Sequence, residues 1–143
     1  MPSGRDLLDR VDGLLHEDTQ VHDGGVDLSV GEMYAVTEPG RVDFGGGELD
    51  PAELTPHERV WRNEDDDYGW WHLDGGTYLL EYNESLDTDD PLVVQPRDAL
   101  RERGATHPTV YVTDLGRIPL TVPDAGFRIK ENARVSTVVA TSG

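Results

Sequence analysis

The arginines of residues 96–104 are the side chains of this sequence best suited to bind an anion. The segment reads Pro-Arg-Asp-Ala-Leu-Arg-Glu-Arg-Gly and places Arg97, Arg101 and Arg103 within seven residues. A guanidinium group presents parallel N–H donors that fit two oxygens of a phosphate. These arginines are the only basic concentration in a chain with 12 Lys and Arg residues against 29 Asp and Glu. Pairing with carboxylates at a subunit interface is an equally good interpretation.

Two further segments with candidate side chains flank the arginines along the chain. Residues 25–31, Gly-Val-Asp-Leu-Ser-Val-Gly, carry Asp27, and residues 127–135, Phe-Arg-Ile-Lys-Glu-Asn-Ala-Arg-Val, carry Arg134. The five histidines show no metal-ligand spacing, and no serine or cysteine elbow accompanies them, so we assign them no chemistry. The candidate chemistry therefore lies in carboxylates and guanidinium groups.

The order of these three segments resembles the dUTPase and dCTP deaminase superfamily, whose trimers bind a deoxynucleoside triphosphate. The resemblance covers about residues 25–44 and 73–140. It implies a homotrimer with dUTP or dCTP bound between subunits and an Asp27 near the triphosphate and its Mg²⁺. Mg²⁺ is usually held by one or two carboxylates plus phosphate oxygens. An Asp27 that only caps a turn is the alternative.

The same resemblance assigns the arginines to the phosphates. Arg97 and Arg101 would contact the triphosphate, and Arg134 is retained from the last shared motif. Two family serines are replaced here by Asp98 and Ala99. A carboxylate at the first of these positions should weaken triphosphate binding, which Arg101 and Arg103 could offset.

The hairpin that holds the pyrimidine and the catalytic carboxylate in the family is shorter in this chain. Tyr111 stands where a dUTPase has its water-activating aspartate, and Thr121 stands where a dCTP deaminase has its glutamate. Neither hydroxyl is a competent base near neutral pH. Asp114 is the only nearby carboxylate that could substitute, although it is displaced by three residues along the chain.

Two function hypotheses follow. The first is an enzyme of deoxypyrimidine nucleotide metabolism, a dUTP diphosphatase or a dCTP deaminase. The second is a catalytically degenerate relative that keeps the trimer and binds a nucleotide or only a protein partner. The replaced serines and the short hairpin favour the second hypothesis, whereas the family resemblance favours the first.

Composition limits the partners. The formal net charge is −17, which disfavours nucleic acid and anionic membranes, and the chain has no cysteine for disulfides or thiolate metal sites. Without a long apolar run or a secretory signal, a cytoplasmic protein is the simplest expectation. The acidic balance with a single lysine is typical of a salt-rich cytoplasm, where short-range screening reduces self-repulsion.

The hydrophobic pattern predicts an all-β fold, a distorted jelly roll with a short N-terminal helix. We expect a single domain over 1–143, with the helix over about 4–16 and the β core over about 25–140. Leu7, Leu8, Val11, Leu14 and Leu15 recur at helical spacing. Alternating and β-branched runs separated by Gly and Pro turns predict strands around 78–82, 93–95, 110–112, 118–120 and 135–140. Residues 97–103 read as a second helical turn.

Overall fold

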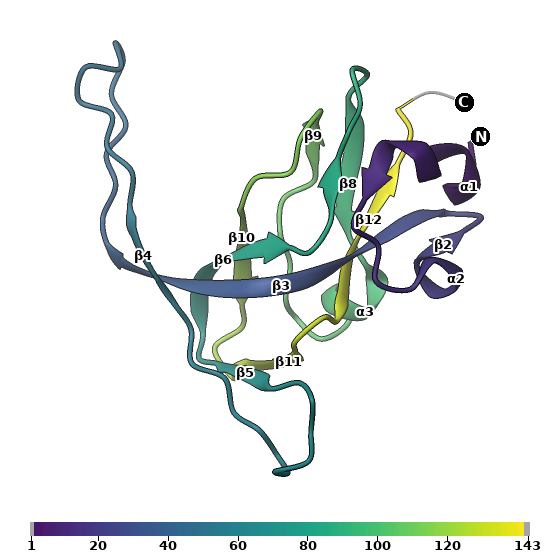
Figure 1. Ribbon diagram of the computed structural model, residues 1–143. Coiled ribbons are helices and arrows are strands. Elements are labelled where there is room, and N and C mark those ends of the chain that lie inside the picture. The colour runs from purple at the N-terminus through teal and green to yellow at the C-terminus, as the bar shows by residue number, and fades with distance from the viewer. Residues whose placement is uncertain (1, 142–143) are drawn as a thin grey trace.

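The computed structural model describes residues 2–141 and is built mainly from antiparallel β-strands (Figure 1). The strands are β1 (Val11–Asp12), β2 (Val21–His22), β3 (Gly25–Glu38), β4 (Glu53–Pro56), β5 (Trp70–Leu73), β6 (Gly76–Tyr82), β7 (Ser85–Leu86), β8 (Leu92–Pro96), β9 (Val110–Val112), β10 (Ile118–Val122), β11 (Phe127–Lys130) and β12 (Arg134–Val139). The helices are α1 (Gly4–Leu7), the 3₁₀ turn η1 (Leu8–Arg10), α2 (Glu17–Gln20) and α3 (Asp98–Arg101). None of the helices found between residues 2 and 141 has the length and apolar character to cross a membrane.

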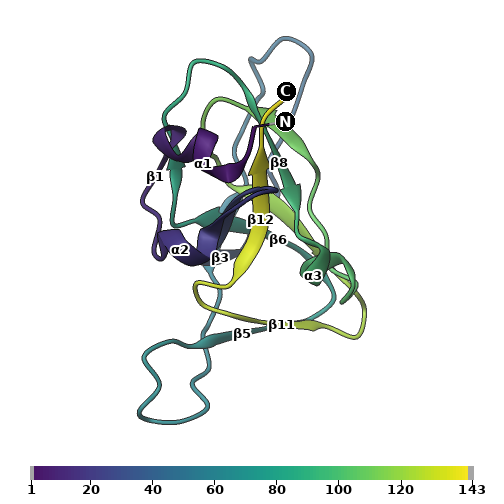
Figure 2. The ribbon, with the colours of Figure 1, turned by 90° about the vertical axis from the view of Figure 1, so that its right-hand side faces the viewer.

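One eight-stranded antiparallel sheet forms the body. Its strand order is β10-β6-β3-β12-β8-β9, with β2 and β4 also paired to β3. The smaller pairs β1–β7 and β5–β11 complete the fold. Figures 1 and 2 show the large sheet curling around the interior. The prediction of an all-β, jelly-roll-like fold with a short N-terminal helix is confirmed.

Strand β3 is buried on both faces over its first half. Val26, Leu28 and Val30 alternate along the strand and lie in the hydrophobic core with no exposed surface. Because successive side chains of a strand point to opposite faces, Asp27 and Ser29 face the other side. Both are also buried, so that face must supply polar partners for them.

The N-terminal helix is shorter than the predicted span of about 4–16. It ends at Leu7, η1 continues to Arg10, and Val11 then pairs with Leu86 as a strand residue. Gly13 follows with a φ of 84°, which no α-helix contains. The apolar spacing that suggests one helix therefore belongs to a helix, a strand and a loop. Leu7 and Val11 lie in the same hydrophobic core, whereas Leu15 in the loop is exposed.

A long hairpin extends from the body between β3 and β4. We call residues 38–53 the arm. Its two sides are joined by reciprocal backbone hydrogen bonds between Arg41 and Asp50, at 2.9 and 3.0 Å. Figure 1 shows the arm projecting away from the curled sheet, with no other element beside it.

Candidate functional site

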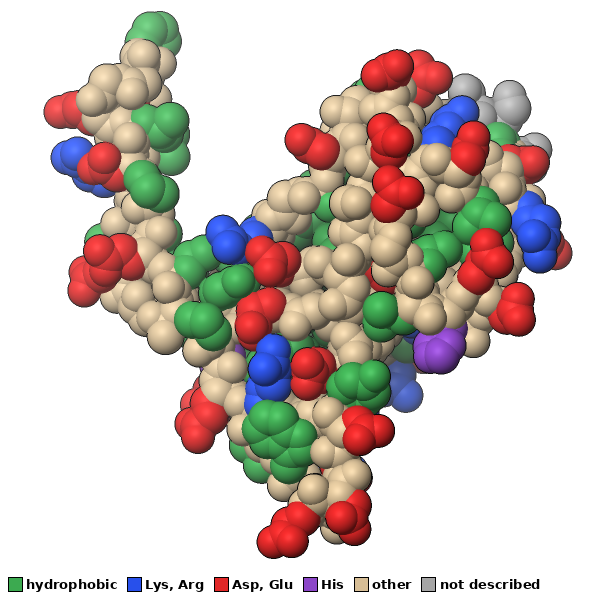
Figure 3. Space-filling model, in the orientation of Figure 1, with side chains coloured by type: hydrophobic (Ala, Val, Ile, Leu, Met, Phe, Trp, Pro, Cys, Tyr) green, Lys and Arg blue, Asp and Glu red, His purple; other side chains and the backbone are tan. Residues whose placement is uncertain are grey.

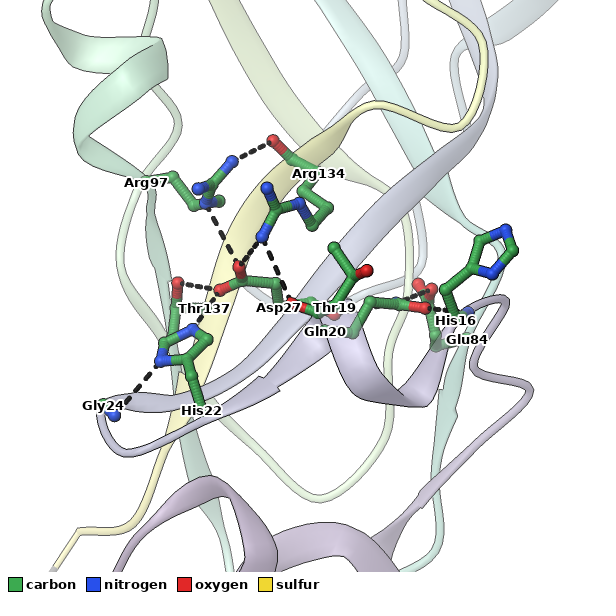
Figure 4. A network of polar contacts seen from close by, with 10 residues as sticks. All are labelled: His16, Thr19, Gln20, His22, Gly24, Asp27, Glu84, Arg97, Arg134 and Thr137. Carbon is green, nitrogen blue, oxygen red and sulfur yellow. Dashed lines mark hydrogen bonds and ion pairs between the residues drawn. The ribbon is translucent and has the colours of Figure 1, made fainter.

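The carboxylate of Asp27 is the centre of a polar cluster on the outer face of β3 (Figure 4). Its Oδ1 accepts hydrogen bonds from His22 Nε2 at 2.9 Å and from Thr137 Oγ1 at 2.8 Å. Its Oδ2 accepts from Arg134 Nη1 at 3.0 Å and lies 3.4 Å from Arg97 Nε. The Gly24 backbone N–H donates to His22 Nδ1, so the Nε2 proton of that ring points at Asp27.

Strand register and one β-bulge assemble this cluster. Thr137 on β12 lies directly opposite Asp27 on β3. Arg134 stands three positions before Thr137, so in a regular strand it would point to the opposite face. The register shifts between Arg134 and Ser136, and this bulge turns Arg134 to the same face as Thr137. Arg97 comes from the next strand, because it follows β8 and precedes α3.

The cluster borders an open pocket of about 520 Å³. Its walls include Thr19, His22, Gln95, Arg97, Arg134 and Thr137. Two guanidinium groups face the Asp27 carboxylate, and the second acid of the wall, Asp98, is paired with Arg101, so one positive charge is in excess. Across residues 2–141, the Nη2 groups of Arg97 and Arg134 make no hydrogen bond to protein. Guanidinium N–H groups of this kind have the geometry to donate to the oxygens of an anion.

The arrangement does not fit Asp27 as a Mg²⁺ ligand. Its side chain is 1% exposed, whereas Arg97 and Arg134 are 26% and 35% exposed and cover it. Each oxygen of the Asp27 carboxylate already faces two N–H or O–H donors. Three of these four donors belong to arginine or histidine side chains. Mg²⁺ requires free carboxylate oxygens and near-octahedral geometry. Within the described residues, no group of three or more acidic, histidine or cysteine side chains could hold a metal ion.

Arg97 therefore has two environments at once. It is partly exposed at the pocket, as an anion-binding role requires, but its Nε is also paired with Asp27 of the same chain. Its Nη1 donates to the backbone oxygen of Arg134 at 3.2 Å. Asp27 of the same chain thus already holds one edge of the Arg97 guanidinium group.

The other two arginines of residues 97–103 lie outside the cluster. Arg101 forms an ion pair with Asp98, three residues earlier on α3, and both side chains are largely exposed. Asp98 is thereby neutralised by its neighbour at the pocket edge. Arg103 donates to the Ala99 backbone oxygen at 2.9 Å and faces a separate apolar hollow.

Asp114 is not brought to the pocket of its own chain. It is an exposed residue in the loop between β9 and β10, which lie at opposite ends of the strand order. Tyr111 is 64% exposed on β9, and Thr121 pairs with Thr106 by backbone hydrogen bonds. None of the three lines the pocket beside Asp27.

A second buried carboxylate supports the cluster from beneath and was not predicted. Glu84 is 4% exposed and accepts hydrogen bonds from the backbone and hydroxyl of Ser29, at 2.8 and 2.6 Å. Gln20 donates to Glu84 at 2.8 Å and to the Asp27 backbone oxygen at 2.9 Å. This links α2 to β3 and fixes the wall of the pocket. No spacing in the sequence signals the contact, because 64 residues separate Gln20 from Glu84.

A separate chain of buried hydrogen bonds runs through His107. Its Nδ1 donates to the Pro108 backbone oxygen at 2.8 Å, and its Nε2 lies 2.7 Å from Ser136 Oγ, which must donate to it. Tyr82 in turn donates to Ser136 at 2.6 Å. Burial lowers the pKa of His107 below its usual 6.5, against the opposing effect of the Pro108 hydrogen bond. Burial also raises the pKa of Tyr82.

The curled antiparallel sheet and the arginine-lined pocket define a class of small all-β proteins with a cationic cleft. No family model matches the chain. It is 32% identical over 133 residues to a probable deoxyuridine 5′-triphosphate nucleotidohydrolase of Methanococcoides burtonii, covering 87% of this chain and 74% of that protein. A protein of the same name from Methanosarcina acetivorans is 33% identical over 126 residues, covering 82% and 70%. One from Halobacterium salinarum is 35% identical over 86 residues, covering 58% and 50%. The chain belongs to the deoxyuridine 5′-triphosphate nucleotidohydrolase (dUTPase) family, as a divergent member.

Proposed function

We propose that this protein is a dUTP diphosphatase of deoxypyrimidine nucleotide metabolism. The observation that carries the proposal is the pair Arg97 and Arg134, held side by side on the buried Asp27 at an open pocket. Guanidinium groups with unpaired N–H donors suit phosphate oxygens. The named activity of the relatives supplies the substrate, a deoxynucleoside triphosphate.

The proposed site is shared between subunits of a homotrimer. Arg97 and Arg134 of one copy bind the triphosphate, and Asp114 of a neighbouring copy accepts a proton from water. The water oxygen bonds to the α-phosphorus, and the bond to the bridging oxygen breaks, so that dUMP and pyrophosphate leave. The second copy is needed because Asp114 does not reach the pocket of its own chain. No step is assigned to Mg²⁺, because Asp27 does not fit as its ligand.

One observation favours a second candidate function, nucleotide binding without turnover. Both carboxylates at the pocket are already paired, Asp27 with two arginines and Asp98 with Arg101. Neither is available as a base. Without a carboxylate from another copy, the pocket would bind an anion and do no chemistry. Deamination of dCTP also needs such a base.

The first experiment measures binding and turnover together. Pyrophosphate and ammonia release are followed with dUTP and dCTP in high KCl with Mg²⁺, alongside the thermal shift caused by each nucleotide. We expect pyrophosphate from dUTP. Arg97→Gln should weaken nucleotide binding about 10- to 100-fold, the usual effect of losing a charge-assisted hydrogen bond. Arg5→Gln, an exposed arginine on α1, is the matched control.

The second variant separates the two candidate functions. Asp114→Asn should abolish pyrophosphate release and leave the nucleotide-induced thermal shift intact, whereas the exposed Asp89→Asn should change neither. Turnover that persists in Asp114→Asn would eliminate this base. A thermal shift with no turnover in the unchanged protein would favour the binding function, and the absence of both would exclude the nucleotide site.

A further inference from the structure

The arm carries large apolar side chains that are exposed to solvent. Phe44 and Val42 are 109% and 89% exposed, and Leu49 is 61% exposed. Figure 3 shows hydrophobic side chains along the projecting arm. Single exposed apolar residues need no explanation, but three large ones on one short hairpin are a feature expected of an interaction site.

The tip is nevertheless held in a defined shape. The Asp43 carboxylate accepts the backbone N–H groups of Gly46 and Glu48, at 2.8 and 3.0 Å. Arg41 and Asp50 join the two sides by backbone hydrogen bonds and an ion pair. A two-stranded hairpin without a packed face is only marginally stable in water. An ordered apolar tip of this kind is expected to gain stability from a partner.

The body carries a hollow that is complementary to the tip in polarity. A cavity of about 210 Å³ lies between α3, β11 and β12. Its walls are mainly apolar and include Leu100, Phe127, Ile129, Ala133 and Val135. Because its floor is part of the hydrophobic core, an aromatic ring placed there would continue that core.

The hollow and the arm are also complementary in charge. Four of the 12 basic residues line the hollow, namely Arg103, Arg128, Lys130 and Arg134. Three of them, Arg103, Arg128 and Lys130, form no ion pair with a carboxylate of residues 2–141. Residues 38–53 hold five carboxylates and one arginine. In a chain of net charge −17, this cationic rim is one of few surfaces that attract another acidic segment.

We propose that the arm of one copy docks into the α3–β11 hollow of a second copy, with Phe44 inserted and the arm carboxylates on the cationic rim. The contact is between copies, since Figures 1 and 2 place the arm tip and β11 well apart in one chain. The two surfaces differ, so the interface is heterologous, and its repetition closes a ring or extends a chain of copies. The inference does not rest on the proposed catalytic activity.

The absence of native cysteines allows a direct test. Gly47→Cys on the tip and Ala99→Cys on the hollow are placed in two co-expressed copies, one with a larger affinity tag, and disulfide formation is followed under mild oxidation. A Cβ at Gly47 would meet nothing within 4 Å. Gly116, in the loop between β9 and β10, shares that property and serves as the matched control. We expect the mixed 47–99 disulfide to form at least tenfold faster than the mixed 116–99 disulfide. Equal rates would overturn the proposal.

A second variant tests the apolar insertion. Adding Phe44→Ser to the Gly47→Cys chain should slow the mixed disulfide at least tenfold, whereas adding Tyr111→Ser, which removes an exposed aromatic ring of the body, should not. If Phe44→Ser leaves the rate unchanged, the arm meets the rim through charge alone and the proposed insertion is wrong. Neither rate depends on nucleotide binding or turnover.

Discussion

Asp27 shows how one buried charge can shape a binding surface. Placing a carboxylate at 1% exposure is costly unless cations and donors surround it, and here two arginines, a histidine and a hydroxyl do so. The carboxylate in return holds two like-charged guanidinium groups close together. Both arginine side chains are also partly exposed. Because Asp27 already restricts their rotamers, they would lose little conformational entropy on binding an anion.

His107 makes stability depend on pH. Burial keeps its folded-state pKa below the usual value of 6.5, so the unfolded chain binds the proton more readily. The contribution of His107 to the free energy of unfolding is therefore complete above pH 6.5 and decreases as the pH falls below 6.5. The prediction is that His107→Gln reduces the loss of unfolding free energy between pH 7.5 and 5.5, measured by urea denaturation in high KCl. The same loss in both proteins would contradict this account.

At the scale of elements, α1 lies against the β2–β3 hairpin through a glycine. A Cβ at Gly4 would overlap the backbone oxygens of Gly25 and His22, which cannot move independently of the hairpin. Since His22 also donates to Asp27, the close approach of α1 helps to position one wall of the pocket. The N-terminal segment is thus part of the site's framework.

Gly4→Ala should therefore lower the free energy of unfolding by about 1–3 kcal/mol, the usual cost of forcing extra atoms into a packed contact. Gly45→Ala is the control, because nothing lies within 4 Å of that position, and its change should stay within about 0.5 kcal/mol. Denaturant unfolding at constant salt measures both. A loss of similar size in the two variants would show that α1 tolerates the added methyl group.

The strands of the body could be predicted because their burial alternates or their residues are β-branched. Residues 78–82 and 118–120 fall in β6 and β10 as expected, and the predicted run 135–140 falls in β12 except for its last residue. The end of the N-terminal helix could not be predicted, because the apolar residues after Arg10 keep helical spacing. In the structure Val11 lies in a paired strand and residues 13–16 form a loop. Tertiary pairing decides such cases.

The arrangement of the site could not be predicted from the sequence. Asp27, Arg97 and Arg134 are separate candidates in the sequence, and nothing in their spacing indicates that they form one cluster. The bulge before Ser136 that turns Arg134 toward Asp27 depends on the pairing of β12 with β3. His22 reaches Asp27 through the β2–β3 hairpin, and one histidine in a short strand gives no signal of this.

At the scale of the whole molecule, charge is unevenly distributed. Figure 3 shows acidic side chains scattered over the body and both projecting segments. Five of the 12 basic residues, Arg97, Arg103, Arg128, Lys130 and Arg134, line two neighbouring hollows that share Ala99 and Arg134. Exposed carboxylates therefore repel one another over most of the surface, whereas these two hollows hold the basic residues that can attract an anion.

This distribution predicts a salt requirement. Because the Debye length is about 3 Å at 1 M ionic strength, molar KCl screens the repulsion among exposed carboxylates. The melting temperature should rise by at least about 5 °C from dilute buffer to molar KCl, equivalent to roughly 1 kcal/mol or more for a domain of this size. Scanning calorimetry across KCl concentrations checks this. A flat melting temperature would rule out the screening effect.

The one lysine of this chain is Lys130, exposed beside the apolar hollow and 5.9 Å from the ring of Trp70. An amine-selective reagent thus has a single side-chain target in the entire protein. A dye coupled at that nitrogen would sit next to a natural indole fluorophore, on the surface where we expect a second copy to bind. The molecule therefore carries its own labelling site and optical reporter at that surface.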